Sequence, residues 1–392
     1  MSEMNVDGQR VLVRADLNVP LRDGRVADDA RLRAALPTFR DILGRGGRLI
    51  VIAHLDRPGG KRDPAASLRP VADALGGMLD RPPSFARDCV GGDAEKAVEA
   101  LGAGECLLLE NLRFHPGEKD NDGDFVDALA GLADLYVNDA FSASHRAHAS
   151  IVGLPERLPS AAGLLMQKEI EHLDRLLSDP DRPFMALLGG AKPKTKLPLI
   201  ERLLDRADRI LLGGVMATTF LKARGVDVGR SKISEDHVGM AEQILRDARG
   251  AKAELLLPTD VVVAESPSAE ADAEVVGLED IGDRMILDIG PETIRHYADA
   301  IEDRGTVVWN GPMGAAEHEP FQEGTHFLAA VIGEQTEMRD LTSVAGGGDT
   351  VAFLQEHQFV HLFTYASMAG GAFLQWLSGK PLPGVEALLR RA

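Results

Sequence analysis

Short apolar runs recur along the chain, and each ends in glycine or polar residues before a segment with helical periodicity. In the first half these runs cover residues 11–20, 49–58, 106–114 and 135–141. In the second half they cover residues 184–192, 210–217, 254–264, 306–314, 341–349 and 362–372. Apolar runs that alternate with helices are typical of parallel sheets covered by helices on both faces. The pattern predicts an α/β fold built on doubly wound parallel sheets.

One helix separates the two groups of runs. Apolar residues at positions 165, 166, 170, 173, 176 and 177 give residues 161–177 a helical period, and two prolines in SDPDRP end that helix. A chain of 392 residues is also too long for one ordinary core. We therefore expect two Rossmann-like domains, residues 1–178, which end in the connecting helix, and residues 179–378. A tail, residues 379–392, is expected to return to the first domain.

The residues that end the runs carry the chemistry, because ligands of parallel sheets bind at the carboxyl ends of the strands. Charged and amide side chains dominate in the first half. They are Asp16, Asn18, His54, Arg57, Arg113 and Asn138 at run ends, with Arg31 and Arg146 in the connections. Guanidinium groups bind phosphate or carboxylate bidentately, so this set predicts a small, doubly anionic substrate. Asp16 and Asn18 are candidates for contact with a hydroxyl group of it.

Glycine dominates at the run ends of the second half, where bare backbone can approach a ligand closely. These glycines are Gly189, Gly190, Gly213, Gly214, Gly311, Gly346, Gly347, Gly348, Gly370 and Gly371. In VAGGGDTVAF, residues 344–353, a helix follows the turn, so Asp349 and Thr350 are placed to cap it or to approach a metal–nucleotide complex. The stretch is neither a Walker A motif nor a dinucleotide fingerprint, and a plain tight turn remains open.

Three of the eleven lysines stand within five residues of LLGGAKPKTKL, residues 187–197. Pro193 suits the first position of a helix. Lys192 and Lys196 then share a face, and with the helix N-terminus they predict a phosphate site. Lys194 is expected to point elsewhere. The alternative is a solvated surface face, and Pro198 predicts a distorted first turn.

Composition narrows the class of protein. With 61 acidic and 43 basic residues, the net charge of −18 argues against binding to nucleic acid or to anionic membranes. There is no signal-peptide pattern at the start and no apolar run of about 18 residues, so we expect a cytoplasmic protein. The excess of acidic residues and of arginine over lysine also predicts a protein from a halophile.

Other catalytic or metal-binding patterns have little support. Cys89 and Cys106 are the only cysteines and have no metal-ligand spacing. His145 and His148 are spaced as a metal pair, but no nearby carboxylate or cysteine completes a site. No Gly-x-Ser-x-Gly elbow indicates covalent acyl transfer.

Together these motifs resemble those of the phosphoglycerate kinase family over essentially the whole chain. Among the twelve matches in family order are VRADLNVP (13–20), AHLDRPGG (53–60), LLLENLRFHPGE (107–118), YVNDAFSASHRAHAS (136–150), LLGGAKPKTKL, VVWNGPMGAAE (307–317) and AGGGDT (345–350). The resemblance implies a two-domain, hinge-bending kinase of glycolysis and gluconeogenesis, with its active-site cleft between the domains. Such an enzyme transfers a phosphoryl group between 1,3-bisphosphoglycerate and ADP, which gives 3-phosphoglycerate and ATP.

The resemblance also implies a role for each matched residue. Residues that bind 3-phosphoglycerate would be Asp16, Asn18, Arg31, His54, Leu55, Asp56, Arg57, Arg113 and Arg146. Residues that bind the nucleotide would be Gly190, Ala191, Lys196, Gly213, Gly214, Asn310, Pro312, Glu317, Gly346, Gly347, Gly348, Asp349 and Thr350, with Glu317 at the ribose and Asp349 at Mg²⁺. The transferring phosphoryl group would be stabilised by Arg31, Lys192, Gly347 and Gly370. The enzyme is expected to act as a monomer.

Three positions depart from the family pattern. The family usually has glycine at Asp56, where an added carboxylate could weaken the binding of an anion. Its Ser-Thr-Gly-Gly-Gly-Ala turn is here Ser367 to Ala372, which keeps two of the three glycines, and Gln375 stands where glutamate is common. Two alternatives remain: an inactive phosphate- or nucleotide-binding protein on the same scaffold, and an NAD-dependent dehydrogenase, which the absent fingerprint glycines disfavour.

Overall fold

The computed structural model describes residues 1, 3–301 and 305–390, and the chain divides into two compact units. The first unit comprises Met1–Glu171 and Pro381–Ala392, and the second comprises His172–Lys380. This division falls within helix α6 (Leu164–Ser178), whereas the boundary expected from the sequence follows that helix. No helix in the described residues is both long and apolar enough to cross a membrane.

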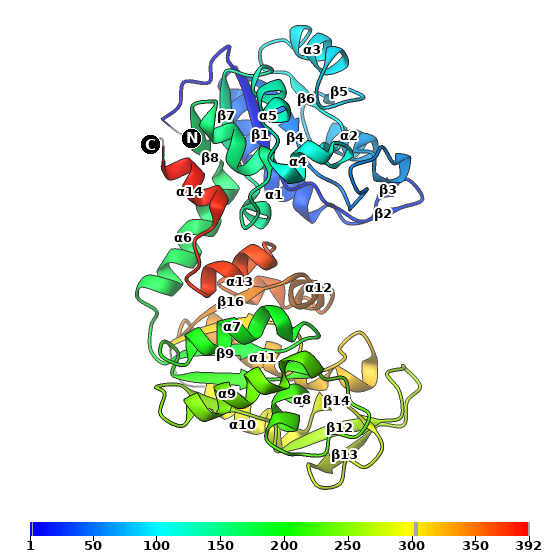
Figure 1. The fold of residues 1–392 in the computed structure, drawn as a ribbon, viewed down its shortest axis with the longest axis vertical. Coiled ribbons are helices and arrows are strands. Elements are labelled where there is room, and N and C mark those ends of the chain that lie inside the picture. Colours follow the sequence, from blue (N-terminus) through cyan, green and yellow to red (C-terminus); the bar gives the residue numbers. More distant parts are fainter. Residues whose placement is uncertain (2, 302–304, 391–392) are drawn as a thin grey trace. The chain divides into compact units, whose positions relative to one another are not determined.

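The first unit is built on a six-stranded parallel sheet in the order β5-β6-β4-β1-β7-β8 (Figure 1). Its strands are β1 (Arg10–Arg14), β4 (Arg48–Ile52), β5 (Ser84–Phe85), β6 (Cys106–Leu108), β7 (Leu135–Asn138) and β8 (Ser160–Ala162). Side chains alternate between its faces. Val11 and Val13 pack with helices α1 (Ala30–Gly44) and α2 (Arg69–Gly76), whereas Leu12 packs with α3 (Gly92–Glu99) and α5 (Gly123–Ala130).

Three smaller elements complete the first unit. The hairpin of β2 (Leu21–Arg22) and β3 (Arg25–Val26) contacts α2, and the short helix α4 (Pro116–Asp120) precedes α5. Helix α14 (Pro383–Leu389) lies against β8 and the turn at Ala149–Gly153, so the end of the chain belongs to the first unit.

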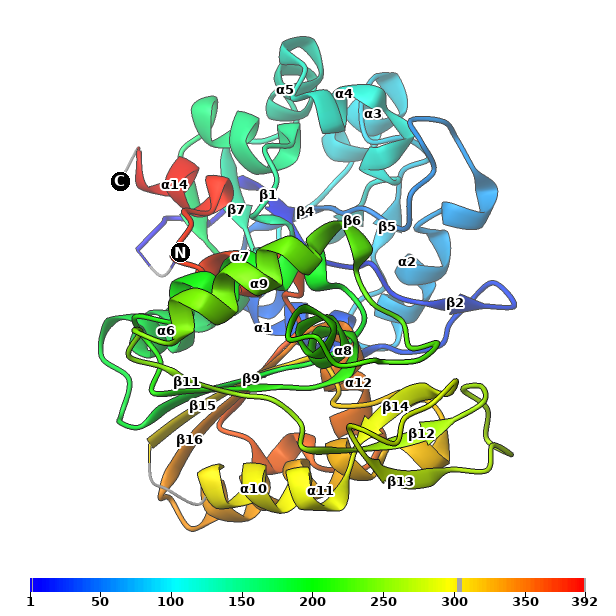
Figure 2. The same ribbon diagram turned by 60° about the horizontal axis from the view of Figure 1, so that its bottom comes forward.

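The second unit contains a second six-stranded parallel sheet, in the order β11-β10-β9-β15-β16-β17. Its strands are β9 (Phe184–Leu188), β10 (Arg209–Leu212), β11 (Glu254–Leu256), β15 (Gly305–Asn310), β16 (Leu341–Gly346) and β17 (Tyr365–Ser367). In chain order this is 3-2-1-4-5-6, the arrangement of nucleotide-binding Rossmann folds. Figure 2 shows α7 (Pro193–Leu203), α8 (Gly214–Ala223) and α9 (Val238–Ala248) on one face, with α10 (Pro291–Ile301) and α11 (Glu323–Glu337) on the other. Two further helices, α12 (Gly348–Glu356) and α13 (Gly371–Leu377), follow β16 and β17.

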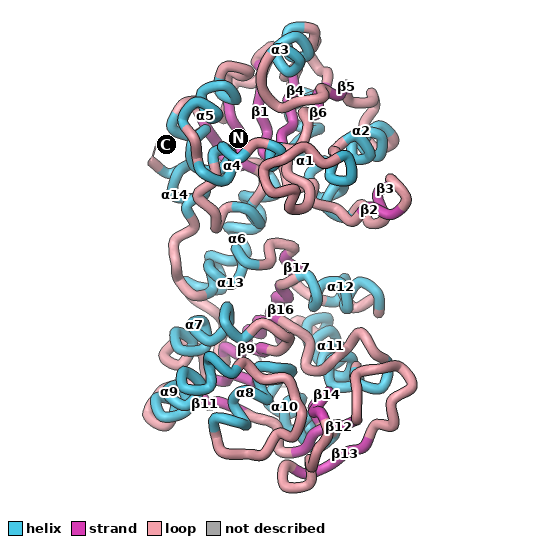
Figure 3. Tube along the Cα trace, turned by 45° about the vertical axis from the view of Figure 1, so that its right-hand side comes forward, coloured by secondary structure: helices cyan, strands magenta, loops and turns pink. Residues whose placement is uncertain are grey.

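The α/β prediction is confirmed, with one correction in the second unit. The run at residues 254–264 forms two strands: β11 joins the large sheet, and β12 (Asp260–Ala264) joins an antiparallel sheet with β13 (Glu274–Gly277) and β14 (Met285–Ile289) (Figure 3). The polar region 266–284, in which no apolar run was identified, therefore contains a strand. Only Val276 of β13 is buried, so this strand has no apolar run. Strands β5, β8 and β14 and the hairpin of β2 and β3 also lie outside the runs identified in the sequence.

Candidate active site

In the first unit, the predicted substrate-binding side chains meet at the carboxyl edge of the sheet. Strand β4 pairs with one edge of β1, and β7, which comes later in the chain, pairs with the other edge. The connections that follow these strands therefore run to opposite sides of β1. Such a switch point leaves a crevice at the strand ends. Asp16 and Asn18 follow β1, His54 follows β4, Arg113 follows β6, and Ser142 follows β7.

Asp16 anchors this edge. Its carboxylate accepts hydrogen bonds from Arg31 Nη1 and Ser142 Oγ, and forms an ion pair with Arg31. The Asp16 side chain is 9% exposed and that of Arg31 is 29% exposed. Part of the Arg31 side chain therefore remains accessible to a ligand. This pair positions Arg31 at the expected substrate site.

The Asp56 backbone joins two predicted ligands. Its N–H donates to Asn18 Oδ1 at 2.8 Å, and its carbonyl accepts from Arg113 Nη1 at 2.6 Å. Asp56 has a φ of +52°, a left-handed conformation in which glycine carries no steric penalty. The family's preference for glycine at this position thus agrees with the backbone geometry observed here. Leu55 also acts through its backbone, which exchanges hydrogen bonds with the side chain of Asn111.

A buried network below His54 was not predicted from the sequence. Arg14 donates to His54 Nδ1 from Nη2 at 2.8 Å and to Ser150 Oγ from Nε at 2.9 Å. Ser150 in turn donates to the buried carboxylate of Glu118 from Oγ at 2.7 Å and from its N–H at 3.0 Å. One sequence feature pointed to this network: Arg14 is a charged residue that directly follows the apolar residues Val11, Leu12 and Val13 of the central strand. It is 1% exposed.

These contacts set the charge of the site. Burial lowers the pKa of His54 well below its ordinary value, and Arg14, Arg113, Arg31 and Arg146 lower it further, so the imidazole is neutral. Burial and the neighbouring arginines lower the pKa of Arg113 to about 10, which leaves it a cation at neutral pH. The region is therefore a cluster of cations around a neutral histidine.

The sequence placed no carboxylate near the two histidines of SHRAHAS, but the structure brings the carboxyl group of Glu118 beside His148. Burial and nearby arginines lower the pKa of His148 to about 4, so its contact with Glu118 at 3.7 Å joins a neutral ring to the carboxyl group. Elsewhere in this unit, Asp88, Cys89 and His115 place one potential ligand atom each within 4.8 Å of one another. However, Asp88 Oδ1 already accepts from the Cys89 N–H and contacts His115 Nε2, both at 2.7 Å, which accounts for this cluster as a structural contact.

In the second unit, the switch point lies between β9 and β15, and the predicted glycine turns meet there. Gly190 donates to the Pro312 carbonyl at 2.7 Å, and Gly214 donates to the Met313 carbonyl at 2.5 Å. Gly214 has a φ of +54°, and a Cβ at this position would lie 2.7 Å from the nitrogen of Gly190. Only glycine lets these three turns approach so closely.

Lys196 lies beneath this crossing and is 5% exposed. Its ammonium donates to the carbonyls of Gly189 and Asn310, the latter at 3.0 Å. Burial lowers its pKa to about 8; nearby Asp349 opposes this shift and Lys192 adds to it. In this structure the Lys196 ammonium therefore joins the residue that follows β9 to the residue that ends β15.

The other two lysines of the cluster are exposed, and Lys192 is the N-cap of α7 rather than a residue within it. Pro193 begins the helix as predicted. Pro198 does not end the helix, because α7 continues through it to Leu203. Lys194 lies in the helix and has an exposed side chain.

The Gly346–Gly348 turn joins β16 to α12 as predicted. Gly347 is the N-cap, with a φ of +97°, and Asp349 is exposed in the first helical turn. Thr350 supports the turn from below, since its Oγ1 accepts from the Gly311 N–H at 2.7 Å. Asn310 Nδ2 likewise donates to the Gly346 carbonyl at 2.6 Å. The side chains of Thr350 and Asn310 therefore link the end of β15 to the end of β16 and the start of α12. Gly370, with a φ of +52°, caps α13 in the same way.

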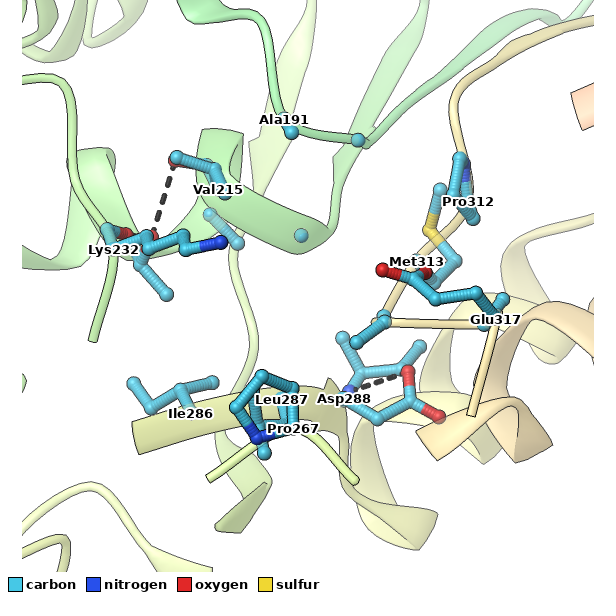
Figure 4. Close-up of a pocket in the computed structure, with 18 of the residues that line it drawn as sticks. Ala191, Val215, Lys232, Pro267, Ile286, Leu287, Asp288, Pro312, Met313 and Glu317 are labelled. Carbon is cyan, nitrogen blue, oxygen red and sulfur yellow. Dashed lines mark hydrogen bonds between the residues drawn. The ribbon is translucent and has the colours of Figure 1, made fainter. Parts of the chain in front are cut away.

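A pocket of about 570 Å³ opens beside these turns (Figure 4). The predicted ligands that line it are Gly190, Ala191, Gly214, Pro312, Glu317 and Asp349. Its remaining walls are mostly apolar and were not predicted; they include Val215, Leu221, Ile286, Leu287 and Met313. Lys196, Gly213, Asn310, Gly346, Gly347, Gly348 and Thr350 are not among the described lining residues and form the supporting layer.

One wall residue of this pocket, Asp288, is an unexpected titratable group. It is 2% exposed, and burial, with Glu323 nearby, raises its pKa to about 7. Its carboxyl group accepts from the N–H groups of Gly324 at 2.8 Å and Ile289 at 2.9 Å. It thereby fixes the start of α11 against β14.

Comparison with known proteins identifies relatives over the whole chain. The family model described as phosphoglycerate kinase matches residues 1–380. The phosphoglycerate kinase of Azorhizobium caulinodans is 50% identical over 391 residues, which are 100% of this chain and 98% of that protein. That of Xanthobacter flavus is 51% identical over 383 residues, 97% of this chain and 96% of that protein. These relatives give no support to the halophile interpretation of the composition.

Solved structures agree at the level of the fold. The phosphoglycerate kinase of Coxiella burnetii superposes with a TM-score of 0.88 at 38% identity and covers 100% of this chain and 99% of its own. That of Pyrococcus horikoshii OT3 has a TM-score of 0.89 at 31% identity with the same coverage.

Proposed function

The chain belongs to the phosphoglycerate kinase family, and from this premise we propose how its two units share the transfer of a phosphoryl group between 1,3-bisphosphoglycerate and ADP. The observation that carries the proposal is the contrast between two strand-end sites. The first unit offers a cationic cluster with a neutral histidine, and the second offers glycine turns around a pocket. A small phosphorylated acid suits the first site, and a nucleotide suits the second.

In the first unit, we propose that Arg31, Arg57, Arg113 and Arg146 bind the phosphate and carboxylate of 3-phosphoglycerate. His54, held in its neutral form, donates a hydrogen bond to the same substrate. Asp16 and Asn18 contact its hydroxyl group, while the Asp16 carboxylate also orients Arg31. Leu55 and Asp56 shape the site through their backbone.

In the second unit, we propose that the nucleotide base enters the apolar part of the pocket and that Glu317 binds the ribose. The phosphates then lie along Gly190, Ala191 and the N-terminus of α12, where the helix dipole favours anions. Lys196 approaches them from the supporting layer. Gly213, Gly214, Asn310, Pro312, Gly346, Gly348 and Thr350 maintain the turns.

The donors present also suit Mg²⁺. The ion commonly binds one or two carboxylates together with nucleotide phosphates, and Asp349 presents an exposed carboxylate beside the phosphate end of the pocket. Asp349 would hold the ion, which neutralises phosphate charge when it is bound.

The chemistry requires positioning and charge stabilisation rather than proton transfer. The substrate carboxylate is ionised at neutral pH, so it needs no general base. We propose that Arg31 and Lys192 stabilise the charge on the transferring phosphoryl group, together with the N–H groups of Gly347 and Gly370. Because the two substrates bind to different units, transfer requires that the units approach and exclude water. We further propose that the enzyme is monomeric and cytoplasmic.

A coupled assay tests this function directly. Purified protein is incubated with 3-phosphoglycerate, MgATP, glyceraldehyde-3-phosphate dehydrogenase and NADH, and the oxidation of NADH is followed. Turnover that depends on both 3-phosphoglycerate and ATP is expected. Binding of both ligands without turnover would instead identify an inactive scaffold.

A further inference from the structure

Glu118 places a carboxylate within the buried network that supports His54. The residue belongs to the short helix α4 and is fully buried. Its two oxygens accept hydrogen bonds from Ser150, Oε1 from the side-chain Oγ at 2.7 Å and Oε2 from the backbone N–H at 3.0 Å. Burial of a carboxylate costs free energy unless donors and cations compensate its charge. The surroundings of Glu118 therefore have to supply a cation.

Arg14 supplies that cation, and it needs an anion in return. Arg14 is 1% exposed, and within the described part of the chain its guanidinium group donates to uncharged acceptors. These acceptors are Ser150 Oγ, the Ala15 carbonyl and His54 Nδ1. Burial raises the pKa of the Glu118 carboxyl group, and the charge of Arg14 opposes this shift. The two residues are thus a buried anion and a buried cation that are joined through one hydroxyl group.

The hydroxyl group of Ser150 has only one orientation that satisfies both neighbours. A guanidinium group only donates hydrogen bonds, and an ionised carboxylate only accepts them. Ser150 Oγ therefore accepts from Arg14 Nε at 2.9 Å and directs its own hydrogen to Glu118. The Ser150 backbone is held as well, since its carbonyl accepts from Tyr136 Oη of β7 at 2.5 Å. Glu118 thereby fixes Arg14, whose Nη2 donates to His54.

We propose that Glu118 is a positioning residue for the binding of 3-phosphoglycerate, which acts on His54 through Ser150 and Arg14. This inference rests on the proposed function, in which the neutral His54 ring donates a hydrogen bond to the substrate. Because Arg14 occupies Nδ1, the donor of that bond is Nε2. Without the charge of Glu118, Arg14 no longer holds the ring in one tautomer and orientation. In part of the molecules the substrate then meets a nitrogen that carries no hydrogen.

A purely electrostatic role of Glu118 would have the opposite sign. Removal of a negative charge beside a cluster of arginines strengthens the binding of an anion, because one repulsive interaction is lost. Loss of positioning weakens binding instead. The direction of the change in affinity therefore separates the two roles.

Glu118→Gln tests the proposal, because it keeps the shape and an acceptor oxygen and removes the charge. The Kd of 3-phosphoglycerate, measured by calorimetry without nucleotide, is expected to rise about tenfold, the difference between a charge-assisted and a neutral hydrogen bond. Its KM in the coupled assay should rise equally, whereas kcat and the KM for ATP should stay within about twofold. Nitrogen-15 spectra of the ligand-free variant should show the Nδ1 signal of His54 shifted toward that of a protonated nitrogen.

Two further variants separate positioning from a loss of stability. Ser150→Ala keeps the charge of Glu118 but breaks its link to Arg14, so it is expected to cause the same rise in Kd and the same spectral change. Asp134→Asn is the matched control. Asp134 forms an ion pair with Arg10 at 2.6 Å at the opposite end of β1, and its loss should leave the Kd and the His54 spectrum unchanged.

An unchanged or lower Kd in Glu118→Gln would overturn the inference, as would a higher Kd with an unchanged His54 spectrum. An equal rise in Asp134→Asn would also overturn it, because the effect would then come from a general loosening of the unit. The spectra of ligand-free protein decide the positioning step even without turnover. Failure of the proposed function appears instead as an absence of turnover in the wild type.

Discussion

Arg14 Nη2 donates a hydrogen bond to His54 Nδ1 at 2.8 Å, and this contact determines which nitrogen of His54 carries the proton. A guanidinium group only donates, so Nδ1 accepts and the hydrogen resides on Nε2. The hydrogen bond from Arg14 therefore fixes His54 as the neutral tautomer with its proton on Nε2. Glu118 and Ser150 hold Arg14 in turn.

We expect His54 to remain neutral, with its proton on Nε2, from pH 8 down to at least pH 6. The groups that face it, Arg14, Arg113, Arg31 and Arg146, are all cationic, and burial also lowers its pKa. Nitrogen-15 spectra of labelled protein would show an unprotonated Nδ1 throughout this range. Protonation of His54 between pH 6 and 7 would contradict the prediction.

The same shift has a consequence for stability. Below the ordinary pKa of 6.5, the unfolded state binds a proton at His54 that the folded state does not, so stability falls as the pH decreases below this value. His54→Asn, whose Oδ1 can still accept from Arg14, is expected to remove this contribution. Urea unfolding at pH 7.5 and 5.5 would show a smaller loss for the variant than for the wild type.

Asp56→Gly is expected to lower the KM for 3-phosphoglycerate about threefold. It removes an exposed negative charge next to the cationic cluster, worth on the order of 1 kcal/mol or less in water. The free energy of unfolding should change by less than about 1 kcal/mol, because relief of the left-handed φ is offset by greater freedom of the unfolded chain. Asp56→Asn removes the charge but keeps a side chain that tolerates this φ. If Asp56→Gly alone lowered KM, the backbone and not the charge would be responsible.

Lys192→Ala is expected to lower kcat at least 100-fold and to retain the fold. A loss of this size is typical when one group that stabilises transition-state charge is removed. Lys194→Ala is the matched control: it is exposed within α7, two residues beyond the N-cap, and should change kcat less than threefold. Circular dichroism of both variants checks the fold. A large effect at Lys194 would contradict the assignment of roles within the lysine cluster.

Gly347→Ala is expected to destabilise the second unit by about 2–3 kcal/mol. A non-glycine residue is strained at a φ of +97°, and its Cβ would lie 2.7 Å from Asn310 Nδ2, which binds the Gly346 carbonyl. A melting temperature lower by roughly 5–10 °C is the measurement. Gly348→Ala is the control for stability, since its Cβ meets nothing within 4 Å and its φ is not positive. Equal melting temperatures for the two variants would refute the strain argument.

The strand ends and glycine turns were predictable because each is a local pattern, an apolar run followed by a charged residue or by glycine. The buried network was not, because Arg14, Glu118 and Ser150 lie 32 to 136 residues apart and meet only after the sheet has formed. The apolar walls of the pocket were missed for a related reason. Val215 and Leu287 have the composition of ordinary core residues, and only the fold directs them toward a cavity. Lys196 shows a third limit, because charge and spacing predicted a phosphate ligand but could not show its bonds to two backbone carbonyls.

Asp288 predicts a dependence of stability on pH in the opposite direction to that of His54. With a folded-state pKa of about 7 and an ordinary value of 3.8, the folded protein holds a proton that the unfolded chain has lost between these limits. The contribution of Asp288 to stability therefore decreases as the pH rises from about 4 to 7 and is fully lost above 7. At 1.36 kcal/mol per pH unit, the total is on the order of a few kcal/mol.

The variant Asp288→Asn tests this dependence, because its side chain cannot ionise. Its free energy of unfolding should therefore rise relative to that of the wild type between pH 5 and pH 8. The altered hydrogen bonds to Gly324 and Ile289 add only an offset that is constant with pH. Parallel stability curves for the two proteins across this range would show that Asp288 is ionised in the folded state at pH 5.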